Sequence, residues 1–174
     1  MYVVVAVYLM VALLLGGAGA AKAITPEPAS VALARLGLPH HLWMVRVLGI
    51  AELAVAVGAF VLGGVGPAIG LAVLYSGFAM VAGAMIRSGS AVPCGCFGRT
   101  AMPATARHVV INILASAAGI AAALWSVEAI DQLVHPRRWL LGPLVALLAA
   151  GAFGLFLLLN QNQPDKTNHQ TSPN

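Results

Sequence analysis

The stretch YVVVAVYLMVALLLGGAGAA, residues 2–21, contains no charged side chain. About 20 apolar residues in a helix cross the ~30 Å hydrocarbon core of a bilayer. The strands of a membrane barrel would alternate apolar and polar residues, whereas this run is continuous. Because backbone polar groups inside lipid must be satisfied within the span, the stretch predicts a transmembrane helix.

The composition of the whole chain indicates the same class of protein. Hydrophobic residues make up 60% of it, charged residues only 8%, and the mean hydropathy is +0.93. A soluble domain has roughly a quarter of its residues charged. We therefore predict an all-α integral membrane helical bundle, with lipid as its surroundings. The net charge of +4 comes from dispersed basic residues, so no nucleic-acid partner is expected.

Four further apolar runs predict four further spans, at about 44–62, 68–86, 105–125 and 139–159. Gly63, Gly64, Gly66 and Pro67 are expected to form the tight connection between two of them. Residues 28–41 mix polar and apolar side chains and predict a short helix at the interface, followed by Trp43 as a headgroup-level anchor. A single transmembrane domain over 2–159 and a disordered polar tail over 160–174 are expected.

A cleaved signal peptide is the alternative interpretation of the first span, because Ala21-Lys22-Ala23 faintly resembles a cleavage site. Signal peptides carry a basic segment before an apolar run of about 7–15 residues. The run over 2–21 is longer and lacks that basic start, so a retained span is favoured.

The only two cysteines, Cys94 and Cys96, share one polar loop between the third and fourth spans. Gly95 between them lets the chain turn tightly enough for the sulfurs to meet. A disulfide in so small a ring is strained and easily reduced, and it would stabilise little because it closes almost no loop. Thiol–disulfide exchange is favoured. One alternative is that the cysteines are inert packing residues. The other is a metal site completed by His40, His41 or His108. Such a site lacks a second close ligand pair, so no metal is expected.

Other polar residues are candidates for support of the cysteines. Glu52 lies inside the second span, where a carboxylate is either functional or part of a structural ion pair; Lys22, Arg46 and Arg107 are its candidate partners. His108, Asn112 and Ser116 share one helix face. His108 could lower a thiol pKa or pass a proton, and Arg99 could stabilise a thiolate. Each has a plain alternative, as an interfacial histidine or a lipid anchor.

At this point the chain resembles a known family. The loop Cys94-Gly-Cys-Phe-Gly-Arg99 is similar to the signature loop of the MauE proteins, relatives of the DoxX family. The Gly-x-x-Lys pattern ending at Lys22, the Gly-x-x-Glu-Leu pattern around Glu52, and Asn112 match weaker landmarks of these families. The resemblance covers about residues 2–159.

The resemblance implies a DoxX-like four-helix core plus a C-terminal fifth transmembrane helix, and a role beside periplasmic disulfide chemistry. The client it implies is the disulfide-containing small (beta) subunit of methylamine dehydrogenase, matured or exported with a thioredoxin-like periplasmic protein. Cys94 and Cys96 would be the redox pair above a polar core of Glu52, Lys22 and Asn112. Whether the chain is itself a thiol–disulfide oxidoreductase stays open. The alternatives are a non-catalytic assembly or export factor with structural cysteines, and a quinone-linked thiol reductase.

The side of the membrane that the cysteine loop faces is also left open by the sequence. With five spans, most Lys and Arg residues fall on the cysteine side, and the positive-inside rule then makes that side cytoplasmic. Oxidative maturation of an exported client requires the periplasm instead. The implied role favours the periplasm.

Overall fold

The computed structural model describes residues 2–89, 104–125 and 150. Its helices are α1 (Tyr2–Ile24), α2 (Glu27–Arg35), α3 (Leu42–Val61), α4 (Val65–Arg87) and α5 (Ala106–Leu124). The all-α prediction is confirmed. The predicted fifth span, the cysteine loop and the tail lie outside the described residues.

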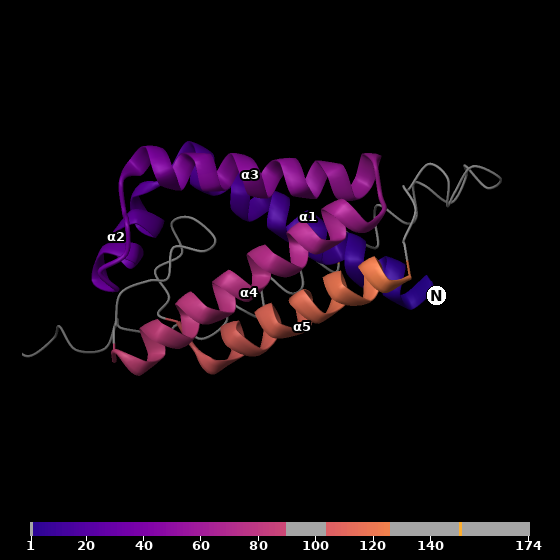
Figure 1. Cartoon of the computed structure of the whole chain (residues 1–174). Coiled ribbons are helices and arrows are strands. Elements are labelled where there is room, and N and C mark those ends of the chain that lie inside the picture. The colour runs from indigo at the N-terminus through magenta and orange to yellow at the C-terminus, as the bar shows by residue number, and fades with distance from the viewer. Residues whose placement is uncertain (1, 90–103, 126–149, 151–174) are drawn as a thin grey trace, which may run out of the picture.

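The four long helices form an antiparallel bundle (Figure 1). Helix α1 packs mainly on α3 and α4 mainly on α5, and contacts of α1 with α5 and of α3 with α4 join the two pairs. The short helix α2 lies at one end of the bundle, together with the C-termini of α1 and α4 and the N-termini of α3 and α5. We call this the α2 end, and the end where α3 turns into α4 the opposite end.

Four helices among the described residues are long and apolar enough to cross a bilayer: α3, α4, α5 and the part Val3–Ile24 of α1. Large apolar side chains cover their outer surface; Val73 and Met80 on α4, for example, are 63% and 71% exposed. Water would disfavour such a surface, whereas lipid does not. The protein is therefore a multi-pass membrane protein.

The predicted bounds differ from the observed ones mainly between α3 and α4. The connection was expected to include Pro67, but α4 already begins at Val65. Proline fits the first helical turn because the backbone N–H groups there have no intrahelical acceptor. The reversal is made by Gly63 and Gly64 alone, with φ angles of 61° and 76° that favour glycine. Residues 28–41 were predicted to contain a short helix, and the helix found there, α2, already ends at Arg35.

Small residues allow a close crossing of α4 and α5. A Cβ atom built on Gly119 would lie 2.9 Å from both the carbonyl oxygen of Ala68 and the amide nitrogen of Ala72. Ala115 and Gly119, four residues apart on α5, therefore lie at a helix contact. A Cβ on Gly66 or Gly83 would meet nothing within 4 Å, so a glycine within a span does not by itself mark a contact.

Candidate functional site: a buried ion pair between α1 and α3

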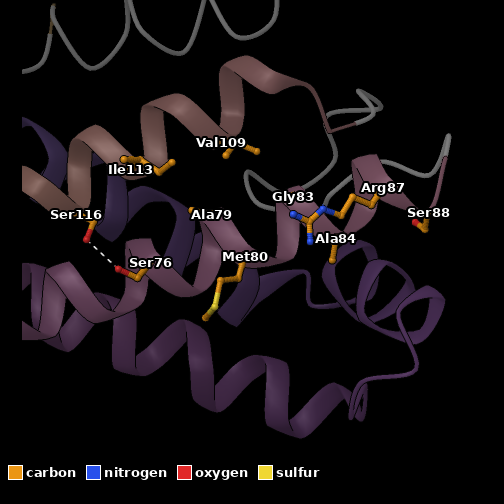
Figure 2. Close-up of a pocket in the computed structure, with 10 residues that line it drawn as sticks. All are labelled: Ser76, Ala79, Met80, Gly83, Ala84, Arg87, Ser88, Val109, Ile113 and Ser116. Carbon is orange, nitrogen blue, oxygen red and sulfur yellow. Dashed lines mark hydrogen bonds between the residues drawn. The ribbon is translucent and has the colours of Figure 1, made fainter.

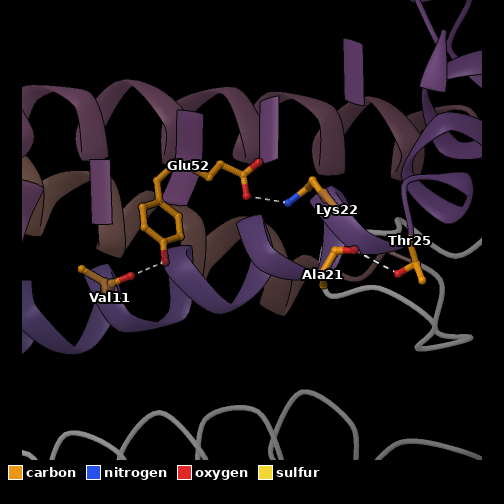
Figure 3. A network of polar contacts seen from close by, with 6 residues as sticks. Val11, Ala21, Lys22, Thr25 and Glu52 are labelled. Atoms are coloured by element: carbon orange, nitrogen blue, oxygen red, sulfur yellow. Dashed lines mark hydrogen bonds and ion pairs between the residues drawn. The ribbon is translucent and has the colours of Figure 1, made fainter. Parts of the chain in front are cut away.

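A lysine and a glutamate form an ion pair inside the bundle (Figure 3). The Nζ atom of Lys22 on α1 donates to Oε2 of Glu52 on α3 at 2.8 Å. Glu52 is 0% exposed and Lys22 only 3% exposed. Of the three basic residues predicted as partners of Glu52, Lys22 is the one in contact, while Arg46 and Arg107 are exposed.

The directions of the two side chains explain how they meet. Helices α1 and α3 are antiparallel, and each Cα–Cβ bond tilts toward the N-terminus of its own helix. Lys22, near the α2 end of α1, therefore points into the bundle. Glu52, deep within α3, points back toward the α2 end. The two long side chains converge from different depths.

Two glycines create the space in which the pair lies. A Cβ on Gly19 would lie 2.6 Å from the carbonyl oxygen of Gly49 and 2.8 Å from Cβ of Glu52. A Cβ on Gly49 would lie 2.6 Å from the carbonyl oxygen of Gly19 and 3.0 Å from Cβ of Lys22. Each glycine thus precedes one charged residue by three positions and accommodates the Cβ of the other.

Aromatic residues of α4 border the pair. Nζ of Lys22 lies 4.8 Å from the centroid of the Phe78 ring, within the range of a cation–π interaction. Tyr75 packs edge-on against Phe78, with ring centroids 6.0 Å apart. The hydroxyl of Tyr75 donates to the carbonyl oxygen of Val11 at 2.7 Å. The ammonium group is thus enclosed by α1, α3 and α4.

The second carboxylate oxygen of Glu52, Oε1, is an available hydrogen-bond acceptor. Oε1 is buried and accepts no hydrogen bond from any of the described residues. An ionised carboxylate has acceptor sites on both oxygens, and an unsatisfied buried acceptor is costly. Oε1 can therefore accept a hydrogen bond or a proton within the bundle.

His108 and Asn112 make hydrogen bonds within the first turns of α5 and not with the ion pair. Nδ1 of His108 accepts from the backbone N–H of Thr105 at 3.2 Å, which makes the two residues a capping box at the start of α5. Nδ2 of Asn112 donates to the carbonyl oxygen of His108 at 2.7 Å. Among the described residues, no hydrogen bond joins Asn112 to Glu52 or Lys22. The proposed polar core is thus represented by Lys22 and Glu52 alone.

His40 and His41, the other histidines considered as metal ligands, stack on each other just before α3, with ring centroids 5.9 Å apart. Among residues 2–89, 104–125 and 150, no three His, Cys, Asp or Glu side chains are grouped as a metal site requires.

The predicted catalytic residues Cys94 and Cys96, together with Arg99, lie outside the described residues. The helices that flank their loop are described. Helix α4 ends at Arg87 and α5 begins at Ala106, both at the α2 end. There Met85 of α4 packs with Ala32 of α2 and with Ala104 just before α5. The cysteine loop therefore starts and finishes at the end of the bundle toward which Glu52 points.

Two features of the site were not anticipated from the sequence. The first is the mutual fit of Gly19 and Gly49; the family patterns contain both glycines, but their contact depends on the pairing of α1 with α3. The second is the border formed by Tyr75 and Phe78. A tyrosine within an apolar span was an available signal, because a buried hydroxyl needs a partner.

Comparison with known proteins identifies the family of the chain. Residues 1–127 match the family model described as "Methylamine utilisation protein MauE". The match includes all five described helices and more than half of the 174 residues. No match is found among curated proteins or among solved structures. The chain belongs to the MauE family, and it is thus a membrane protein of methylamine utilisation.

Proposed function

We propose that the protein supports thiol–disulfide exchange in the maturation of a periplasmic client protein, with Cys94 and Cys96 as the redox pair. It would lie in the inner membrane with its α2 end toward the periplasm. By resemblance, the client is the small subunit of methylamine dehydrogenase.

The observation that carries the proposal is the position of the buried ion pair relative to the ends of the cysteine loop. Glu52 is directed toward Lys22 (Figure 3), on the side of the bundle at which α4 ends and α5 begins. An ion pair inside a membrane domain is costly, which favours a use beyond packing. Lys22 and Glu52 hold α1 against α3, and Oε1 of Glu52, which accepts no hydrogen bond from the described residues, is an available acceptor on that side.

The exchange proceeds through a mixed disulfide. A client thiolate attacks one sulfur of the Cys94–Cys96 disulfide and releases the other as a thiolate. The second client thiolate then attacks the mixed disulfide, so the client gains a disulfide and the protein keeps a dithiol. The disulfide between Cys94 and Cys96 is then restored by a thioredoxin-like periplasmic protein in its disulfide form. A thiolate of the pair attacks that disulfide, and the second thiolate of the pair attacks the resulting mixed disulfide. Two electrons pass at each transfer, from the client to the protein and from the protein to the disulfide of the thioredoxin-like protein, which is the oxidant and ends as a dithiol.

Trapping of the mixed disulfide tests this function. One of the two single variants, Cys94→Ser or Cys96→Ser, keeps the cysteine whose sulfur forms the mixed disulfide. We expect that variant to accumulate a covalent complex with the client or the thioredoxin-like protein. The complex should be visible on non-reducing gels and lost on reduction. The Cys94→Ser/Cys96→Ser double variant is the control and should give no complex.

The client's disulfides provide the second measurement. Loss of either cysteine should leave the small subunit incompletely oxidised. If client oxidation is unchanged in the double variant, the redox role is wrong. The protein would then be a non-catalytic assembly or export factor.

A further inference from the structure

A groove of about 800 Å³ lies between α4 and α5 (Figure 2). Its walls include Met80 and Gly83 from α4 and Val109 and Ile113 from α5. Met80 is 71% exposed and Ile113 is 54% exposed, so the groove opens on the outer surface of the bundle, which faces lipid. Its volume is in the range of roughly 300–1,000 Å³ found for ligand sites.

The deep end of the groove has no hydroxyl proton to offer a ligand. Oγ of Ser116 donates to the carbonyl oxygen of Ala72 at 3.0 Å. The 2.9 Å contact between the hydroxyls of Ser76 and Ser116 therefore uses the proton of Ser76. Both protons are committed, which disfavours a quinone carbonyl at this depth, because a carbonyl can only accept.

The shallow end of the groove carries a positive charge. Arg87 is in the last turn of α4, at the level of the bilayer interface. Figure 2 shows its guanidinium turned back along α4 over the groove, near Gly83 and Ala84. None of the described residues that line the groove is acidic, and within the described part of the chain the one salt bridge is that of Lys22 with Glu52. A guanidinium is well suited to a phosphate, which it binds through two hydrogen bonds.

The length of the groove matches one leaflet. Arg87 and Ser76 are eleven residues apart on α4, which corresponds to about 16 Å along the helix axis. Half of a ~30 Å hydrocarbon core is nearly the same distance. A ligand that fits has an anionic head at Arg87 and an apolar chain that ends near Ser76.

We propose that the groove binds one anionic phospholipid from the leaflet at the α2 end, with its phosphate on Arg87 and an acyl chain between Met80 and Ile113. This proposal does not depend on the redox function. It assigns the protein a specific lipid partner in addition to its general lipid surroundings.

Native mass spectrometry of the full-length protein in mild detergent tests the proposal. Phosphatidylglycerol and phosphatidylcholine with identical acyl chains are titrated separately. We expect one phosphatidylglycerol to bind about tenfold more tightly than phosphatidylcholine, and Arg87→Gln to remove this preference, because one charged hydrogen-bonded contact is lost.

Two further variants locate the lipid. Arg46→Gln removes an exposed arginine from α3 at the same end, outside the groove, and should keep the preference. Gly83→Leu fills the groove and should weaken phosphatidylglycerol binding about tenfold. A Cβ at Gly83 meets no atom within 4 Å, and the rest of the leucine side chain extends into the groove; an unchanged circular dichroism spectrum checks that the variant is folded.

Three results would overturn the proposal. The first is equal loss in Arg87→Gln and Arg46→Gln, which indicates diffuse attraction by surface charge. The second is unchanged phosphatidylglycerol binding by Gly83→Leu. The third is tight binding of decylubiquinone that displaces phosphatidylglycerol, which would assign the groove to a quinone.

Discussion

At the scale of single residues, the two buried charges depend on each other. Lys22 and Glu52 lie in a setting where an isolated ion would be very costly. Their contact at 2.8 Å offsets part of the cost of removing both from water. Removal of one partner takes the ion pair from the other, which costs more than removal of both.

We predict that Glu52→Met lowers the free energy of unfolding by about 3–5 kcal/mol, the usual loss when one member of a buried ion pair is removed. The Lys22→Met/Glu52→Met double variant should lose less than the single variant, because neither charge of the pair is then buried. Unfolding in mixed micelles, followed by circular dichroism, measures the values. Strictly additive losses in the double-mutant cycle would show that the two charges are not coupled.

At the scale of elements, the crossing of α1 and α3 depends on a backbone contact that only glycine allows. The backbones of the two helices approach so closely that a methyl group on Gly49 would overlap the carbonyl oxygen of Gly19 and the amide nitrogen of Ala23, at 2.6 Å and 2.8 Å. Backbone atoms cannot rotate away as a side chain can. An added methyl group must therefore push the helices apart, and Lys22 moves away from Glu52.

We predict that Gly49→Ala destabilises the protein by about 1–3 kcal/mol, as overpacking in a close-packed interior does. Gly17→Ala is the matched control, since its Cβ would meet nothing within 4 Å; it should stabilise α1 by up to about 1 kcal/mol. The free energies of unfolding of both variants, measured under the same conditions, test this prediction. Equal effects of the two substitutions would contradict the close crossing.

At the scale of the whole molecule, basic side chains among the described residues gather at the α2 end. Four exposed arginines lie at the α2 end: Arg35, Arg46, Arg87 and Arg107. Lys22 does not add to this surface, because it is buried with Glu52. The positive-inside rule still favours the cytoplasm for this end, whereas the proposed function requires the periplasm.

Labelling of single cysteines in intact cells separates these two orientations. In a Cys94→Ser/Cys96→Ser background, we predict that His41→Cys at the α2 end reacts with a membrane-impermeant maleimide. Leu62→Cys, which replaces a 74% exposed residue at the opposite end, should react only after lysis. The reverse pattern would place the α2 end in the cytoplasm and contradict the periplasmic function. Labelling of both sites from outside would show that α3 does not span the membrane.

The sequence by itself determined the class of the protein and the number and approximate bounds of the described spans. Apolar runs of membrane length are a local property, which any arrangement of the helices would share. The same reasoning singled out Glu52, because a carboxylate within a span needs a partner wherever it lies. It did not choose among Lys22, Arg46 and Arg107.

Only the tertiary structure decided that choice, since it depends on which helices are neighbours and at what depth they cross. The contact of Gly19 with Gly49 sets the depth at which Lys22 reaches Glu52. The same holds for the groove, because Arg87 and Ser116 come from different helices. Spacing along one helix gives the residues of a face; the packing of two helices decides what that face meets.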